Sequence, residues 1–269
     1  MLVDSLIDSA RYDLFDQAST SEYHARFRRD GVCVLPGFLG RDAVEILRRE
    51  CDRLAPLAHR SSTTASPYLA PIEESFPEGH PRRVVSASSV EVVAYDLFPA
   101  DSPLRRLYES DSLLDFVRRC LGLQDLHRYA DPLGALNLAI MRDGDCLGWH
   151  FDMADFVVSI AIQSSEGGGE FENAKQIRSA QDECYPDVAE VLSGGRPDRV
   201  FTEPMTPGTL MLFDGRWSLH RVTTIRGPVP RYVALLAYDS EPGTDSSETL
   251  KLSRYGRLPA GVPTKDIDS

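Results

Sequence analysis

Three residues of this 269-residue sequence have the types and spacing of a metal site. His150 and Asp152 are two positions apart, so in a β-strand they project from the same face. His220 follows in a separate β-type run and would supply a third ligand. Two histidines and one carboxylate leave three coordination positions open, which is typical of non-haem Fe(II) oxygenases. The absence of cysteine from this set argues against structural zinc.

The surroundings of this motif decide its meaning, because a single His-x-Asp pair is common by chance and a lone strand histidine is usually a core residue. Arg231 lies eleven residues after His220, at the start of the apolar run RYVALLAYD. An arginine entering the interior beside Val233 and Leu235 requires an anion. A carboxylate of a dicarboxylate co-substrate would suit its planar fork, and the alternative is a salt bridge at the rim.

Further polar and aromatic residues are candidates for weaker roles. Asn137, on the run before the motif, would hydrogen-bond the co-substrate or pair with a neighbouring strand. Trp217 would form a wall of the substrate pocket, and Asp155 would meet a cationic substrate. Three arginines are unranked candidates for a substrate carboxylate: Arg142, Arg178 and Arg226.

The elements that must position these residues change character along the chain. Helices are expected in the first half, over 41–54 and from Pro103 to Gly122, together with a short strand at 31–39, a β-rich run at 84–98 and a long polar loop at 61–81. From 134 onward, short β-type runs alternate with Gly and Pro breaks, which favours a sandwich or barrel. We therefore expect one domain over 1–240, mainly β with flanking helices, with helical and lid elements mainly in 1–130 and the barrel core at about 131–240. Residues 241–269 would form a polar tail or a lid.

Charge and composition exclude several classes of partner. The formal net charge is −12 and the sequence pI is about 5.0, so no broad basic field is available for nucleic acid or an anionic membrane. No apolar run approaches the ~20 residues that span a bilayer. Five scattered cysteines indicate neither a disulfide framework nor a zinc site, so we expect a cytoplasmic protein.

The order of the motif residues resembles that of the Fe(II)/2-oxoglutarate-dependent dioxygenases. The segment RFRRDGVCVLPGFLGRDAVEILRRE is similar to the start of phytanoyl-CoA-hydroxylase-like members. GWHFDMADFVVSIAIQ and GGGEFENAKQIRS resemble the bacterial family of free-amino-acid halogenases and hydroxylases. The resemblance implies a double-stranded β-helix, or jelly roll. It also implies that His150, Asp152 and His220 bind Fe(II) and that Arg231 holds the distal carboxylate of 2-oxoglutarate.

The carboxylate ligand indicates the type of reaction. Halogenases of the resembled family replace this carboxylate with a small residue to admit chloride, whereas this chain keeps Asp152. We therefore expect hydroxylation of an unactivated C–H bond in a small polar metabolite such as a free amino acid, using O₂ and converting 2-oxoglutarate to succinate and CO₂. The alternatives are a carrier-tethered or nucleoside substrate, desaturation or cyclisation, and a catalytically silent metabolite-binding barrel.

Overall fold

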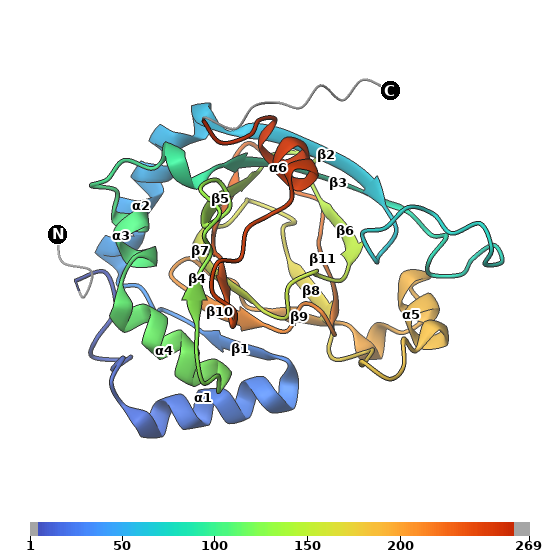
Figure 1. Ribbon diagram of the computed structural model, residues 1–269, viewed down its shortest axis with the longest axis horizontal. Helices are drawn as coiled ribbons and strands as arrows, with labels where there is room; N and C mark the ends of the chain where they lie inside the picture. Colours follow the sequence, from blue (N-terminus) through green and yellow to red (C-terminus); the bar gives the residue numbers. More distant parts are fainter. Residues whose placement is uncertain (1–4, 261–269) are drawn as a thin grey trace.

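Two antiparallel sheets enclose the interior of the protein (Figure 1). The computed structural model describes residues 5–260. The larger sheet has the order β1-β10-β7-β12-β5-β3-β2 and the smaller one the order β6-β11-β8-β9. The larger sheet consists of β1 (Val32–Leu35), β2 (His59–Ala65), β3 (Ser86–Val93), β5 (Leu136–Met141), β7 (Val157–Gln163), β10 (Leu210–Phe213) and β12 (Arg231–Leu236). The smaller sheet consists of β6 (Leu147–His150), β8 (Phe171–Ala174), β9 (Phe201–Glu203) and β11 (Leu219–Val222). A short pair is formed by β4 (His127–Arg128) and β13 (Tyr238–Asp239).

The four helices described in the N-terminal half cover the outer face of the larger sheet (Figure 1). In chain order, the helices are α1 (Gln17–Asp30), α2 (Arg41–Leu54), α3 (Pro103–Tyr108), α4 (Asp111–Leu121), α5 (Tyr185–Leu192) and α6 (Glu248–Tyr255). Single 3-10 turns occur at η2 (Ala55–Leu57), η3 (Tyr95–Leu97) and η4 (Pro197–Arg199). Leu47 of α2 and Phe116 of α4 are fully buried in one cluster with Leu138 and Ile160 of the sheet. Because strand residues alternate between faces, the intervening positions of β5 and β7 point into the barrel.

The fold class predicted from the sequence is confirmed: mainly β with flanking helices, in a jelly-roll arrangement. The expected division between helical and β regions is too simple, however. β1 and β3 lie within the β-type runs expected at 31–39 and 84–98, but they extend the larger sheet of the barrel, and β2 occupies part of the segment expected to be a loop. Helix α5 lies in the second half, where only strands were expected.

Two other local expectations also differ from the structure. The helix expected from Pro103 to Gly122 is divided, because the side chain of Ser110 accepts a hydrogen bond from the Leu113 amide and begins α4 there. The segment expected to be a tail or lid contains α6, and its residues 261–269 lie outside the described part of the chain. No helix within residues 5–260 is both long and apolar enough to cross a bilayer.

Candidate metal centre

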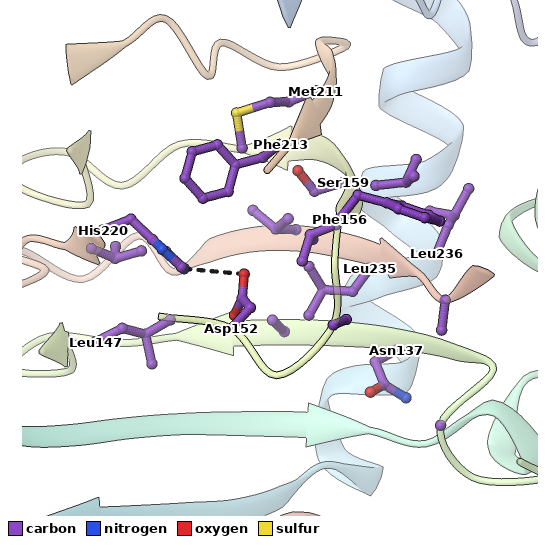
Figure 2. Close-up of a pocket in the computed structure, with 18 of the residues that line it drawn as sticks. Asn137, Leu147, Asp152, Phe156, Ser159, Met211, Phe213, His220, Leu235 and Leu236 are labelled. Carbon is purple, nitrogen blue, oxygen red and sulfur yellow. Dashed lines mark ion pairs between the residues drawn. The ribbon is translucent and has the colours of Figure 1, made fainter. Parts of the chain in front are cut away.

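The sheet pairing brings the three predicted metal ligands together. His150 at the end of β6 and His220 on β11 are direct partners in the antiparallel pair, with ring centroids 4.2 Å apart. Asp152 follows β6 by two residues, and its carboxylate faces the Nε2 atoms of both rings. Its Oδ1 is 3.8 Å from His150 Nε2 and its Oδ2 is 3.4 Å from His220 Nε2. Figure 2 shows Asp152 and His220 pointing toward one another in the pocket.

Both imidazole rings are oriented by backbone carbonyls. His150 Nδ1 lies 2.7 Å from the Gly148 carbonyl oxygen, and His220 Nδ1 lies 2.9 Å from that of Ser218. Donation from Nδ1 leaves a lone pair on each Nε2, directed at the shared centre. Burial, followed by the nearby charge of His220, lowers the pKa of His150 to about 4, so its neutral, ligating form prevails at neutral pH.

The carboxylate of Asp152 completes a donor set suited to a divalent metal. Its Oδ2 is buried and has no hydrogen-bond donor. Burial opposes its ionisation, but the facing histidines outweigh burial and the pKa of Asp152 is lowered. Its backbone is fixed by donation from the Asp152 amide to the Gly215 carbonyl oxygen at 3.0 Å. A buried carboxylate oxygen beside two imidazole nitrogens, with all three ligand atoms within 4.8 Å of one another, fits an iron ion.

Arg231 enters the interior without an acidic partner. It is 8% exposed and begins β12 opposite Met141 of β5. Within residues 5–260 its guanidinium approaches the Met141 sulfur at 4.0 Å and forms no salt bridge, so the alternative of a rim salt bridge is wrong. Burial lowers the pKa of Arg231 to about 10, and the group therefore stays cationic at neutral pH. A buried, unpaired cation is costly, so an anion bound at this position would stabilise it.

One cavity connects the metal ligands with Arg231. Its volume is about 300 Å³, and its walls are mainly apolar, formed by inward-facing residues such as Leu147, Phe213 and Leu235 (Figure 2). Ser159 of β7 also lines it and carries a buried hydroxyl that has no hydrogen-bond partner among residues 5–260. The sequence analysis missed Ser159, because a serine within an apolar run has no distinguishing pattern.

Asn137 lines the same cavity, but its amide is hydrogen-bonded within the protein. Nδ2 donates to the carbonyl oxygens of Leu133 and Leu136 at 2.9 and 2.8 Å. Oδ1 accepts from the hydroxyl of Tyr255 at 2.8 Å. Its observed contacts therefore stabilise the wall of the cavity.

The two predicted substrate contacts do not line this cavity. Trp217 is not among its lining residues, and its ring lies 5.6 Å from the guanidinium of Arg178. Asp155 is also absent from the lining and pairs with Arg216 at the surface. Asp155 comes three residues after Asp152, and Trp217 comes three residues before His220. Their side chains instead contact Arg216 and Arg178, respectively.

The three arginines proposed for a substrate carboxylate are also outside the cavity. Arg142 pairs with Glu91 at 2.8 Å and Arg178 with Glu183 at 3.0 Å. Arg226 lies on a separate groove, whose lining includes Cys146 and Trp149. The cavity instead contains Arg254 of α6, from the segment expected to be a tail or lid.

Comparison with known proteins places this site in a family. A family model described as Halogenase D matches residues 15–253. No curated protein matches the chain. Among solved structures, the α-ketoglutarate-dependent carbocyclase SnoK from nogalamycin biosynthesis is 14% identical with a TM-score of 0.59, over 90% of this chain and 93% of that one.

Two further solved structures share the fold. The epimerase SnoN from the same biosynthesis is 17% identical with a TM-score of 0.55, over 83% of each chain. HygX from Streptomyces hygroscopicus, with nickel, 2-oxoglutarate and hygromycin B bound, is 18% identical with a TM-score of 0.54, over 87% of this chain and 95% of that one. The chain therefore belongs to the halogenase D family, and it shares its fold with these Fe(II)- and 2-oxoglutarate-dependent enzymes.

Proposed function

We propose that this protein hydroxylates a small polar metabolite, with a free amino acid as the first candidate, while converting 2-oxoglutarate to succinate and CO₂. The observation that carries the proposal is the unpaired guanidinium of Arg231, buried in the same cavity as the His150, Asp152 and His220 donor set. A three-ligand metal face and a separate anion site meet the two requirements for binding a 2-oxo dicarboxylate.

The chain's own residues supply ligation, orientation and exclusion of water. His150, Asp152 and His220 would hold the iron, and Arg231 would bind the distal carboxylate of 2-oxoglutarate through its planar fork. The bound iron and 2-oxoglutarate supply the O₂ chemistry that oxidises a C–H bond. The apolar walls around the metal face limit access of water to the reacting groups.

The retained carboxylate favours hydroxylation over halogenation. With three protein ligands, a chelating 2-oxo acid and O₂, the six positions of an octahedral metal are filled, and none remains for a halide. The Oδ2 atom of Asp152 is buried, and its carboxylate faces both histidines, as a ligand must. The family name therefore does not transfer its halogen chemistry to this chain.

The cavity volume of about 300 Å³ favours a small substrate. Reconstitution with Fe(II) and 2-oxoglutarate without O₂ tests the cofactor chemistry, with the expected result a weak visible charge-transfer band. Adding O₂ and a panel of amino acids should then produce succinate together with a product 16 Da heavier than one of them. Absence of both the band and succinate formation would contradict the proposal and would favour a silent binding barrel.

A further inference from the structure

Helix α6 forms one wall of the cavity. Leu250, Arg254 and Tyr255 all line it. The Ser61 hydroxyl of β2 donates to the Ser253 carbonyl oxygen at 2.9 Å, and the Tyr255 hydroxyl reaches Asn137 of β5. Figure 1 shows α6 in red beside β2 and β3, at the edge of the barrel. The helix is thus attached to the sheet at two points and presents one cation to the interior.

The two cations of α6 are in different electrostatic situations. Lys251 is buried and forms ion pairs with Asp245 and Asp131. Arg254 forms no salt bridge within residues 5–260, and its Nε is buried without a hydrogen-bond partner. Because a buried donor without a partner is costly, the position of Arg254 is explained if a ligand supplies the acceptor.

Arg254 lines the same cavity as the metal ligands His150, Asp152 and His220. Burial raises the pKa of Tyr255 overall, and the guanidinium of Arg254 beside it opposes that rise. The guanidinium is therefore part of the wall that α6 contributes to this cavity.

The cavity thus contains two arginines without a protein carboxylate, and 2-oxoglutarate can satisfy only one of them. One of its carboxylates belongs to the metal chelate, and the other would bind Arg231. We propose that Arg254 binds a carboxylate of the primary substrate, so that the substrate is an organic acid or amino acid with a free carboxylate. This inference rests on the proposed function, because it assigns Arg231 to 2-oxoglutarate.

The geometry of the two sites supports this division of roles. Arg231 starts β12 and is fixed in the sheet, as a site for an obligatory co-substrate should be. Arg254 comes from a helix packed against the barrel edge, where a variable substrate would be contacted. A planar guanidinium binds a carboxylate through two parallel hydrogen bonds, which a carboxamide cannot reproduce.

The test compares Arg254→Gln with Arg257→Gln. Arg257 is three residues farther along, pairs with Asp96 at 2.6 Å and does not line the cavity, which makes it a matched control. The first measurement is 2-oxoglutarate affinity from the anaerobic Fe(II) charge-transfer band. The second is succinate formation with the proteinogenic L-amino acids, common 2-hydroxy acids and their carboxamides. The third is calorimetric binding of the responding compound to the Ni(II)·2-oxoglutarate protein, in which no turnover occurs.

The expected results separate the two arginines. Compounds with a free carboxylate should stimulate succinate formation and their carboxamides should not. Arg254→Gln should weaken the responding compound by about 10- to 100-fold in both KM and calorimetric Kd. Its affinity for 2-oxoglutarate should stay within about twofold of wild type. Arg254→Lys should restore part of the loss, and Arg257→Gln should behave as wild type.

Other outcomes would overturn the inference in recognisable ways. If only uncharged compounds respond, or no carboxylate does, Arg254 does not bind a substrate carboxylate. The same conclusion follows if Arg254→Gln weakens 2-oxoglutarate and leaves the responding compound unchanged. If wild type binds no 2-oxoglutarate in the first measurement, the proposed function itself fails and the inference fails with it.

Discussion

The carboxylate of Asp152 lies directly against Gly215, where an added Cβ atom would be 1.8 Å from Oδ2. The same two residues share a backbone hydrogen bond, from the Asp152 amide to the Gly215 carbonyl oxygen. Gly215 belongs to the turn that precedes β11 and therefore His220. The loop after the first histidine and the turn before the second thus pack closely, and the absence of a side chain at Gly215 leaves room for the carboxylate of Asp152.

We expect Gly215→Ala to weaken Fe(II) binding while the fold persists. The new methyl group would collide with Asp152 Oδ2 and Cγ, so the carboxylate would have to rotate away from the two histidines. Fe(II) affinity, measured by competition with a chromogenic chelator, reports the change. Gly167→Ala is the control, because a Cβ there makes an ordinary contact of 3.6 Å. A folded Gly215→Ala protein with wild-type iron affinity would show that Asp152 is not a ligand in this position.

Single substitution of the metal ligands should abolish activity. In His150→Ala, Asp152→Ala and His220→Ala, one of three donors is lost and no other His, Cys, Asp or Glu of the described chain completes the group. We expect iron content to fall and 2-oxoglutarate decarboxylation to cease in each variant. Metal analysis and succinate assays measure the two effects. If two of the three variants kept near-wild-type turnover, the ligand assignment would be wrong.

Substitution of Arg231 should separate co-substrate affinity from iron affinity. Arg231→Lys keeps a charge but loses the planar fork, so we expect 2-oxoglutarate to bind about 10- to 150-fold more weakly, on the basis of about 1.5–3 kcal/mol for a hydrogen bond to a charged group. Iron affinity should change little. Titration of the charge-transfer band measures the affinity for 2-oxoglutarate, and competition with a chelator measures the affinity for iron. An unchanged 2-oxoglutarate titration in a folded variant would move this role to another residue.

The candidate ligands could be selected from the sequence, because their types and spacing are typical of a metal site. Strand periodicity was expected to place residues 150 and 152 on one face, whereas β6 ends at His150 and Asp152 faces both histidines from the loop that follows. The cost of burying Arg231 in an apolar strand is itself enough to indicate an anion site. The fold class was predictable for the same reason, since short runs punctuated by Gly and Pro specify an all-β core.

Features that depend on long-range packing were not predictable. Nothing near Gly215 in the sequence shows that a carboxylate from residue 152 occupies the space beside it. Arg254 lies in a polar segment, and its position in the cavity depends on α6 packing against β2. Trp217 was expected at the pocket because of its proximity to His220 in sequence, but neighbouring residues of a strand or turn point in different directions.

The carboxyl group of Asp214, next to Gly215 in sequence, should make the stability of the folded state depend on pH. Burial raises the pKa of Asp214 from its ordinary value of 3.8 to about 6. The folded state therefore binds this proton more tightly than the unfolded state. The stability contributed by the protonated carboxyl is complete below about 3.8 and is lost as the pH rises through about 6.

Asp214→Asn removes the buried charge, so we expect it to raise Tm relative to wild type at pH 8 and to raise it less at pH 5. Thermal unfolding at the two pH values measures the difference. Asp125→Asn, at an exposed position, should show no such difference. An equal effect of Asp214→Asn at both pH values would contradict the raised pKa.

Product analysis in chloride tests whether Asp152 excludes a halide. With the carboxylate bound, 2-oxoglutarate and O₂ would fill the remaining positions of the metal, so wild type should give a hydroxylated product and no chlorinated one even at high chloride.

Asp152→Gly would open one position while the histidines and the chelating 2-oxo acid retain the metal. Transfer of chlorine would also require the reacting carbon of the substrate to lie nearer the halide than the oxygen that is transferred in hydroxylation. We do not expect a hydroxylase cavity to hold its substrate in that position. We therefore expect a largely inactive variant with at most traces of chlorinated product. Mass spectrometry distinguishes the outcomes, and a chlorine isotope pattern from the wild-type protein would refute both the Asp152 assignment and the hydroxylase proposal.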